Sequence, residues 1–458
     1  MNSESRMQGS QPHSMFFYAT IFVVMKHLAY AIALIFLSCK ESTQNTGAIF
    51  TASDLNAANR RLLEVAMEDG FPPPIASRVY AYPHIAHYIT LQKFYPDSLS
   101  EIAGKLNGLA PLDNIDIQRA HPELTSLLSF CRTAKRVVFS EHYMDVLADG
   151  IIAQAAAGGL RSSTIDASIA CADSISKVLG IWIAGDNYGQ TRTMDRWTST
   201  KKPGKWIETP PDYIQGMEPH WMKIRPFVLD SVSVFKAAPL PAYDPSKGSE
   251  FYKMVFEVYE QSMRLDPGMQ EIAMFWDDNP NVTEHRGHLV VQIHKIAPPG
   301  HWLNIIHQVS SVENSSLFTL TTAYAYTAVA MFDVILSCWH TKYNTDLVRP
   351  ITYIQENIDA NWRPLIQTPP FPEYTSGHSA ISAAAATVLT DIFGDNYAFA
   401  DSTNVLFDQP VRDFKSFHDA AWEVSLSRFY GGIHYMQGIV EGNRQGKFIG
   451  QLVLNELK

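Results

Sequence analysis

The sequence has little of what marks several common protein classes. Its four cysteines, at positions 39, 131, 171 and 338, are widely spaced and form no Cys-x-x-Cys pair, which argues against a disulfide scaffold and against the usual zinc motifs. Lysine and arginine number 36 against 46 acidic residues, so a basic, nucleic-acid-binding face is not expected. Strand-like alternation of β-branched residues is scarce. What is present is a 458-residue chain with 46% hydrophobic residues, enough to bury a large core.

The N-terminus carries an export pattern. A short basic start at Lys26 and His27 is followed by an apolar run that ends at Leu37-Ser38-Cys39, an order that resembles a bacterial lipoprotein signal. The alternative is a membrane anchor, but the apolar runs 15–25 and 28–38 are each too short to span a bilayer alone. We therefore expect an exported bacterial protein, either periplasmic or an outer-membrane-anchored or extracellular lipoprotein. In that reading Cys39 is the only link to a membrane.

The rest of the chain has a helical pattern. From about Asn56, segments rich in alanine and leucine show helical periodicity and are punctuated by Gly and Pro. We predict an all-α fold in which a C-terminal four-helix-bundle core, within 271–458, packs against an N-terminal helical region, 56–270. Ahead of these lie a signal peptide with an extra N-terminal segment, 1–38, and a polar tether, 39–55.

Two further segments need interpretation. The proline-rich connections 200–227 and 236–250 are too aromatic for simple linkers, and we expect them to wrap the surface and pack through Trp206, Trp221 and Phe227. The apolar stretch 315–339 carries hydroxyl side chains and Asp333, so we interpret it as a buried core helix rather than a membrane span.

Three short motifs carry most of the chemistry. Lys342 and Arg349 are seven residues apart, two helical turns, with Pro350 after the arginine. Alone, such a pair is usually a solvated surface. Ser376-Gly377-His378 stands where an alanine-rich helix begins; it could be an ordinary cap or an oxyanion site at a helix N-terminus.

The third motif is Ser427-Arg428 followed by His434, with Gly431-Gly432 between them permitting a sharp turn. A lone histidine is more often a packed core residue than a ligand. Taken together, however, one lysine, two arginines, a helix N-terminus and two histidines describe a site for a tetrahedral oxyanion. One histidine would bond the central atom and the other would transfer protons.

These motifs, K-x6-RP, SGH and SR-x5-H in this order, resemble the signature of the superfamily that joins vanadium-dependent haloperoxidases with type 2 phosphatidic acid phosphatases and acid phosphatases. The flanking residues resemble the haloperoxidase branch, and in particular bacterial iodoperoxidases. Trp339 stands three before the lysine and Phe371 seven before His378, and "GKWIETPPDY", "MFWDDNP" and "SRFYGGIHY" also fit that pattern. The resemblance runs from roughly residue 60 to the end.

The resemblance implies roles for individual residues. His434 would be the vanadium ligand, and His378 the acid–base toward hydrogen peroxide. Trp339 and Phe371 would line the halide side. The equatorial oxygens of vanadate would be held by Lys342, Arg349, Ser376, the Gly377 N–H and Arg428. The implied reaction oxidises halide, with iodide first and bromide next, to hypohalous acid that halogenates small organic acceptors; the implied cofactor is vanadate and no haem.

Two departures from the family pattern stand out. Thr375 replaces a proline before SGH, which would loosen the approach of that loop, and Gly438 replaces an acidic residue four after His434. We expect a backbone carbonyl or Glu441 to orient His434 instead, and Asp333 to pair with one of the arginines.

Alternatives remain open at this stage. The same pocket could belong to a phosphomonoesterase with a histidine nucleophile, or to a surface lipoprotein that only binds an oxyanion. The choice among iodide, bromide and chloride, and between monomer and dimer, is not fixed by the sequence.

Overall fold

The first helix among the described residues of the computed structural model, α2 (Ala52–Glu68), begins where Thr51 and Asp54 form a capping box. It therefore starts inside the predicted tether, and Phe50 is already buried. The structure describes residues 48–280, 282–286 and 288–458. The predicted signal segment and Cys39 lie outside the described residues.

The N-terminal helices surround one long buried helix. α3 (Pro73–Phe94) is buried on nearly every side, and it packs against α4 and the later α11. Its His84 ring stacks on Tyr324 of α11 at 4.5 Å between centroids. The other helices of this region are α4 (Pro122–Ala134), α5 (His142–Ala157), α6 (Ser162–Ala184) and α7 (Tyr188–Thr191).

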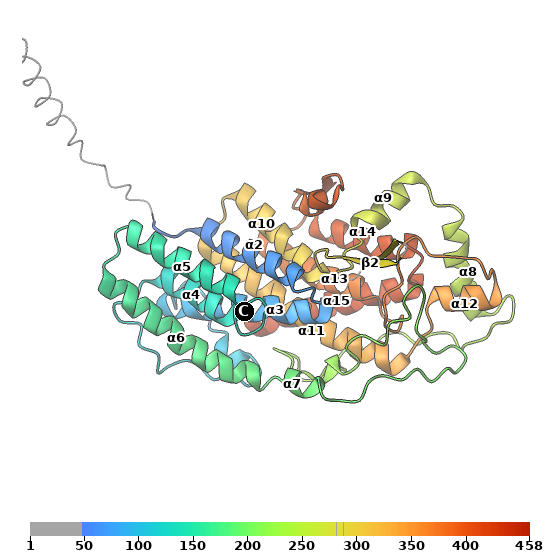
Figure 1. The fold of residues 1–458 in the computed structure, drawn as a ribbon, viewed down its shortest axis with the longest axis horizontal. Coiled ribbons are helices and arrows are strands. Elements are labelled where there is room, and N and C mark those ends of the chain that lie inside the picture. The colour runs from blue at the N-terminus through green and yellow to red at the C-terminus, as the bar shows by residue number, and fades with distance from the viewer. Residues whose placement is uncertain (1–47, 281, 287) are drawn as a thin grey trace, which may run out of the picture. The chain divides into compact units, whose positions relative to one another are not determined.

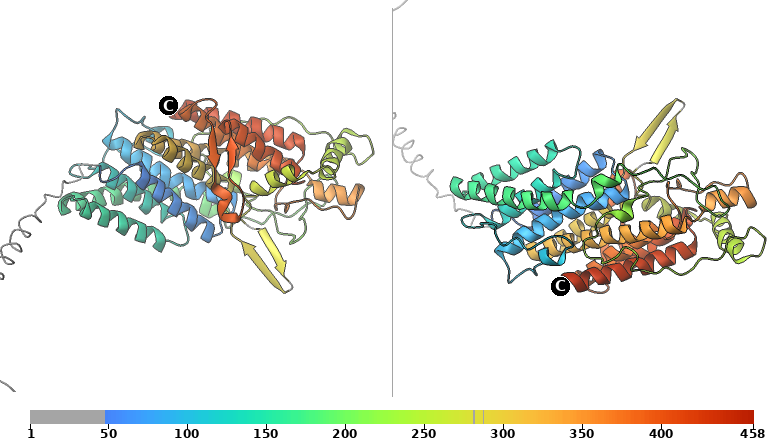
Figure 2. Two further views of the ribbon diagram at one scale, coloured as in Figure 1. Left: turned by 90° about the horizontal axis from the view of Figure 1, so that it is seen from above. Right: turned by 90° about the horizontal axis from the view of Figure 1, so that it is seen from below.

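The C-terminal half contains a four-helix core. α13 (Gly377–Phe393) packs against the three other members, as Figures 1 and 2 show for the segments coloured orange to red. These are α11 (Leu317–Thr345), α14 (Phe417–Tyr430) and α15 (Met436–Leu457). The remaining helices of the half are α8 (Glu250–Ser262), α9 (Pro267–Phe275), α10 (Pro298–Glu313) and α12 (Pro350–Asn357). The all-α prediction is confirmed.

A glycine stripe brings α15 close to α13. Gly438, Gly442, Gly446 and Gly450 recur every four residues on α15, so they share one face of the helix. A Cβ on Gly442 would lie 2.7 Å from the carbonyl oxygen of Ser376, and one on Gly446 would overlap the carbonyl of Ala380. The absence of side chains at these positions lets α15 press on the start of α13, where the SGH motif lies.

Two expectations about the connections and the core helix are confirmed. Trp206, Trp221 and Phe227 are fully buried. Two helical stretches of the described residues, Ser162–Thr191 and Leu317–Thr345, are long and apolar enough to cross a membrane by length and composition, and the second is mostly buried within the fold.

The expected pairing of Asp333 with an arginine is wrong. Its carboxylate accepts backbone N–H groups from Phe227, Val228 and Leu229 at 2.7, 2.8 and 3.2 Å. Burial raises the pKa of Asp333 to about 6, while these three donors oppose the rise. Asp333 therefore fixes the wrapping connection to α11.

Two short hairpins were not expected from the sequence. β1 (Val282–Arg286) pairs antiparallel with β2 (Leu289–Ile293), and this hairpin projects from the helices in both views of Figure 2. β3 (Phe399–Asp401) pairs with β4 (Arg412–Phe414).

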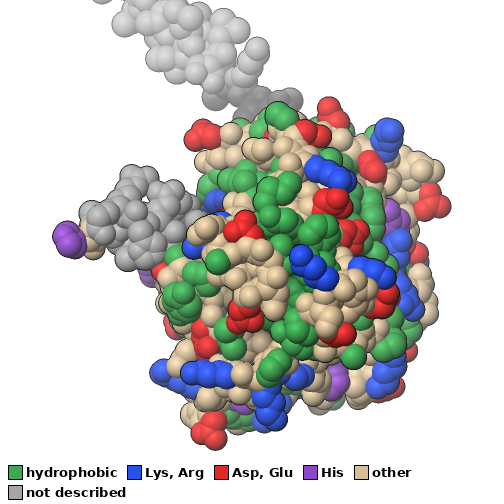
Figure 3. All heavy atoms as spheres, turned by 90° about the vertical axis from the view of Figure 1, so that its right-hand side faces the viewer, with side chains coloured by type: hydrophobic (Ala, Val, Ile, Leu, Met, Phe, Trp, Pro, Cys, Tyr) green, Lys and Arg blue, Asp and Glu red, His purple; other side chains and the backbone are tan. Residues whose placement is uncertain are grey.

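Residues 49–458 cluster as one unit, and the division near residue 270 stays a prediction. On the face in Figure 3 acidic and basic side chains are interspersed.

Candidate active site

Lys342 and Arg349 reach the same loop, 371–373, from the end of α11 and the start of α12. α11 stops at Asp346, whose φ of 51° breaks the helix, and Arg349 is the extended residue before Pro350. The Lys342 ammonium donates to the carbonyls of Pro372 and Glu373 at 3.0 and 2.9 Å. Arg349 Nε donates to the Phe371 carbonyl at 2.8 Å. Both cations are thus fixed by the loop that precedes the SGH motif.

Burial lowers the pKa of both the Lys342 ammonium and the Arg349 guanidinium. Burial, assisted by the charge of Arg349, lowers the pKa of Lys342 to about 7. Burial also lowers the pKa of Arg349 to about 10, so its guanidinium stays charged at neutral pH. An anion in the pocket would favour the protonated lysine.

The SGH motif caps α13 inside the core. The Ser376 hydroxyl accepts the Ser379 N–H at 3.4 Å, and its own N–H donates to the Gly438 carbonyl at 2.9 Å. A Cβ on Gly377 would lie 3.7 Å from the Trp339 ring and 4.0 Å from the Lys342 side chain, so the helix N-terminus faces the lysine. A helix N-terminus with charge near +0.5 attracts oxyanions.

Thr375 does not loosen this loop, contrary to expectation. Its hydroxyl donates to Gln445 Oε1 at 2.5 Å, and Gln445 Nε2 donates to Ser337 Oγ at 2.9 Å. The residue is fully buried, and it connects the SGH loop to both α15 and α11.

His434 follows the turn after α14 and meets Arg349. Its Nε2 lies 3.3 Å from Arg349 Nη1, and the same Nη1 donates to the Ile433 carbonyl at 2.8 Å. Burial and the cations Arg349 and Lys342 hold the pKa of His434 well below its usual range. The imidazole is therefore neutral, with one ring nitrogen available as a ligand.

Glu373 orients His434, and the predicted candidates do not. Its Oε1 lies 2.6 Å from His434 Nδ1 and accepts the Tyr435 N–H at 3.1 Å. A carboxylate at Nδ1 places the ring proton there and leaves the Nε2 lone pair directed at the pocket. Glu441 instead pairs with Arg444 and accepts the Ala238 N–H.

The substitution at position 438 is explained by the same contact. A Cβ on Gly438 would overlap Glu373 Oε1. The acid that orients His434 thus lies in the loop before α13 rather than on α15, and glycine at position 438 leaves the space for it. Glu373 stands three residues before Ser376 in the sequence, but without a structure nothing indicated that its side chain points back at His434.

Trp339 and Phe371 form an aromatic wall beside the cations. Their ring centroids are 5.1 Å apart. The Lys342 Nζ and the Arg349 guanidinium carbon each lie 5.0 Å from the Phe371 centroid, a distance for cation–π contact. The two rings lie side by side, and their predicted role in lining the halide side stays a prediction.

His378 and Arg428 line a small cavity next to this wall. The cavity has a volume of about 30 Å³, enough for one or two water-sized groups. Phe371, Ile433 and Met217 also line it. We call it the halide chamber after the expectation that Phe371 lines the halide side, a role that stays a prediction. Burial and the nearby Arg428 hold the pKa of His378 well below its usual range, so His378 is a neutral base.

A larger cavity, about 780 Å³, is lined by Lys201–Lys205 and Tyr213 and by none of the predicted site residues.

Arg428 is held by α9 and the residues after it. Its Nη2 donates to the carbonyls of Trp276 and Ala273 at 2.6 and 3.3 Å, and Nη1 lies 4.0 Å from Asp277. Asp277 also contacts Lys295 at 3.3 Å. The sequence did not predict these partners of Arg428. The segment "MFWDDNP" shows an acidic pair, but it does not show which distant side chains that pair contacts.

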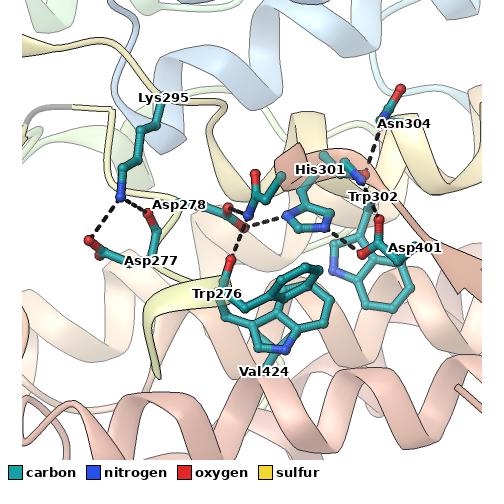
Figure 4. A network of polar contacts seen from close by, with 12 residues as sticks. Trp276, Asp277, Asp278, Lys295, His301, Trp302, Asn304, Asp401 and Val424 are labelled. Atoms are coloured by element: carbon teal, nitrogen blue, oxygen red, sulfur yellow. Dashed lines mark hydrogen bonds and ion pairs between the residues drawn. The ribbon is translucent and has the colours of Figure 1, made fainter. Parts of the chain in front are cut away.

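A buried His–Asp network joins α10 to the residues after α9 and to β3 (Figure 4). His301 Nδ1 lies 2.8 Å from Asp278 and its Nε2 2.7 Å from Asp401. Burial alone would lower the pKa of His301, but the two carboxylates raise it to about 10. Asp278 also lines the halide chamber, so His301 fixes part of the chamber's lining. His301 was not among the predicted site residues.

The site has the donors for an oxyanion. Among the described residues, Arg349 Nη2 and His378 Nε2 are buried polar atoms without a hydrogen-bond partner. Buried cations are costly unless they are paired, and Lys342 and Arg349 are held by backbone carbonyls. A tetrahedral oxyanion bonded at His434 Nε2 would offer acceptors to these groups, so the cationic donor set fits an anionic oxometal group. The described residues include no group of three or more His, Cys, Asp or Glu that could hold a metal ion.

Comparison with known proteins identifies the family. The chain matches the crystal structure of a bacterial vanadium-dependent iodoperoxidase with 41% sequence identity and a TM-score of 0.83, over 89% of this chain and 97% of that one. The chain belongs to the vanadium-dependent haloperoxidases.

Other comparisons agree with that assignment. A family model described as "VCPO second helical-bundle domain" matches residues 322–458 of the haloperoxidase. Holo and apo structures of a bacterial vanadium-dependent chloroperoxidase share the fold, each at 15% identity and a TM-score of 0.58; they cover 84% of this chain and 93% and 95% of their own. No curated protein matches the chain.

Proposed function

We propose that this haloperoxidase oxidises iodide with hydrogen peroxide, using vanadate held by His434, and that the hypohalous acid halogenates small organic acceptors. The observation that carries the proposal is the His434 geometry. Glu373 holds the ring at 2.6 Å from Nδ1 while Nε2 faces Arg349. A neutral, oriented imidazole among buried cations is the arrangement that a bonded oxyanion requires.

The residues that would hold vanadate are those the sequence named. Lys342, Arg349 and Arg428 would balance its negative charge, and Ser376 with the Gly377 N–H would donate to its oxygens. When bound, vanadate would supply Lewis-acid activation of peroxide without a change in its own oxidation state.

The chain's own side chains would manage protons and charge. His378 is neutral, and its Nε2 has no partner within the protein, so it can accept a proton from hydrogen peroxide as the peroxide enters. Lys342 is fixed by two carbonyls and can place its remaining proton toward the charge that develops as halide is oxidised.

Iodide is the proposed halide for two reasons. The solved iodoperoxidase is 41% identical. Phe371, Ile433 and the prolines form the apolar part of the lining of the halide chamber, and this part disfavours strongly hydrated anions. Iodide is the most weakly hydrated and most easily oxidised halide considered, and bromide is the next candidate.

We also propose that the protein is exported and tethered through Cys39, on the basis of the N-terminal sequence pattern. Metabolic labelling with a radioactive fatty acid would test this: loss of label in Cys39→Ala supports the tether, and an unlabelled wild-type protein opposes it.

The test of the activity uses the full chain, freed of metal and incubated with orthovanadate. We expect peroxide-dependent triiodide formation that requires vanadate and is abolished in His434→Ala. It should persist in His307→Ala, a partly exposed histidine of α10 that belongs to none of the three motifs. Bromide, chloride and an aryl phosphate are assayed in parallel. Phosphate release without halide oxidation would replace the proposal with a phosphomonoesterase.

A further inference from the structure

Met217 is fixed beside the aromatic wall by its own backbone. Its N–H donates to the Pro370 carbonyl at 2.8 Å. Its carbonyl accepts the Tyr343 hydroxyl at 2.6 Å and the Trp339 indole N–H at 3.3 Å. Pro370 precedes Phe371, so these bonds hold Met217 against both aromatic residues of the wall.

Met217 lines the chamber together with the groups proposed to act on peroxide. The chamber's lining includes His378, Arg428 and Phe371 as well as Met217. Among the described residues that line it, Met217 has the only sulfur atom. A thioether is soft and readily oxidised to a sulfoxide, whereas the other side chains there are prolines, amides, carboxylates, a phenyl ring, an isoleucine, an arginine and the imidazole.

We propose that Met217 is a self-oxidation site, at which hypohalous acid formed in the chamber converts the thioether to the sulfoxide before leaving the protein. This rests on the proposed function. The sulfur attacks the halogen of hypohalous acid and releases hydroxide, and water then replaces halide on sulfur with loss of two protons. In sum the thioether gains one oxygen and is oxidised by two electrons, hypohalous acid is reduced to halide, and one proton is released.

The modification changes the chamber in a defined way. A sulfoxide is polar and larger than the thioether, and it would lie beside the Phe371 wall. We expect a rise in KM for iodide of at least threefold in protein oxidised at this residue. Reduction by methionine sulfoxide reductases would reverse the change, so Met217 acts as a brake set by the enzyme's own product.

The exposed fraction of each methionine distinguishes self-oxidation at Met217 from oxidation by a reagent in bulk solution. Met263 and Met274 are 60% and 40% exposed, while Met217, which lines both the chamber and a surface hollow, is less exposed than either. An oxidant arriving from bulk solution should therefore modify Met263 and Met274 first. An oxidant formed inside the chamber should modify Met217 first.

The experiment uses the vanadate-loaded full chain with iodide and peroxide, in excess thiosulfate, which reduces iodine species that leave the protein. Sulfoxide at each methionine is measured by fragmentation mass spectrometry, which separates Met217 from Met222 in the same tryptic peptide. Turnover is measured in parallel without thiosulfate, from triiodide formation. A second sample receives iodine added to enzyme without peroxide.

We expect at least a fivefold higher sulfoxide fraction at Met217 than at Met263 during turnover, and the reverse order with added iodine. Omission of vanadate, iodide or peroxide should abolish the Met217 signal. Met263→Leu should leave this signal and the initial rate unchanged, and Met217→Leu, normalised to its own initial rate, should lose activity more slowly.

Two results would overturn the inference. Turnover that forms triiodide while Met263 and Met274 are oxidised before Met217 would refute self-oxidation but leave the proposed function intact. Absence of triiodide formation would refute the proposed function itself, and self-oxidation with it.

Discussion

Replacing Glu373 tests whether a relocated acid orients His434. Glu373→Gln keeps the shape but removes the charge that fixes the Nδ1 proton, and Glu373→Ala removes the 2.6 Å contact altogether. Loss of the partner that orients a metal-ligating histidine typically weakens metal binding 10- to 100-fold, about 1.4 to 2.7 kcal/mol. We expect Gln near the lower value and Ala near the upper one.

A double variant makes the prediction sharper. A side chain at Gly438 would overlap Glu373 Oε1, so Gly438→Asp alone should destabilise the protein by about 1–3 kcal/mol through overpacking. Combining it with Glu373→Ala opens that space and returns an acid to α15. We therefore expect the double variant to bind vanadate more tightly than Glu373→Ala alone, and to unfold at higher urea than Gly438→Asp alone.

The assay is a calorimetric titration of metal-free protein with orthovanadate, with urea unfolding measured alongside. Glu441→Gln is the matched control, because Glu441 is buried near the same turn but contacts Arg444 and the Ala238 N–H rather than His434. Wild-type vanadate affinity in Glu373→Ala, with the protein folded, would refute the orienting role.

Three further outcomes follow from the packing and the charges. Gly446→Ala should lower the free energy of unfolding by about 1–3 kcal/mol because its Cβ overlaps the Ala380 carbonyl, whereas Gly150→Ala, with open space around it, should raise it by up to about 1 kcal/mol. Asp333→Ala should lose at least about 3 kcal/mol, since three buried N–H groups lose their acceptor. Burial lowers the pKa of Lys342 to about 7, so vanadate affinity should be highest below that pH and fall up to tenfold per unit above it.

Each of these has a clear contrary result. Equal urea midpoints for Gly446→Ala and Gly150→Ala would mean that α13 and α15 are not in close contact. An Asp333→Ala protein as stable as wild type would mean that the wrapping connection does not depend on that carboxylate. For Lys342 the comparison is Lys342→Gln, measured over the same pH range so that vanadate's own protonation cancels. Identical pH slopes in the two proteins would exclude the lysine as the titrating group.

The sequence predicted the helices and the motifs because both are local signals. Helical periodicity and alanine content identify α11 and α13 directly. The spacing of the cationic motifs and the SGH cap could be read in order along the chain. The family resemblance assigned Trp339 and Phe371, 32 residues apart in sequence, to one side of the site, and their rings lie 5.1 Å apart.

What the sequence did not predict depends on contacts between distant segments. Glu373 lies 61 residues from His434, and only the fold places its carboxylate at Nδ1. The Asp278–His301–Asp401 network joins three segments in the same way. Asp333 looked like an arginine partner because a buried carboxylate usually has a charged partner, but backbone N–H groups satisfy it. α2 begins inside the predicted tether because Thr51 and Asp54 form a capping box. The polar composition of that segment did not indicate a helix start.

The most direct test is a crystal structure of the wild-type protein soaked with orthovanadate. We expect vanadium bonded to His434 Nε2, with its oxygens contacting Lys342, Arg349 and Arg428, and with the Glu373–His434 contact retained. Vanadate elsewhere on the protein, or density in the pocket with Nε2 unbonded and the imidazole turned away from Glu373, would contradict the account.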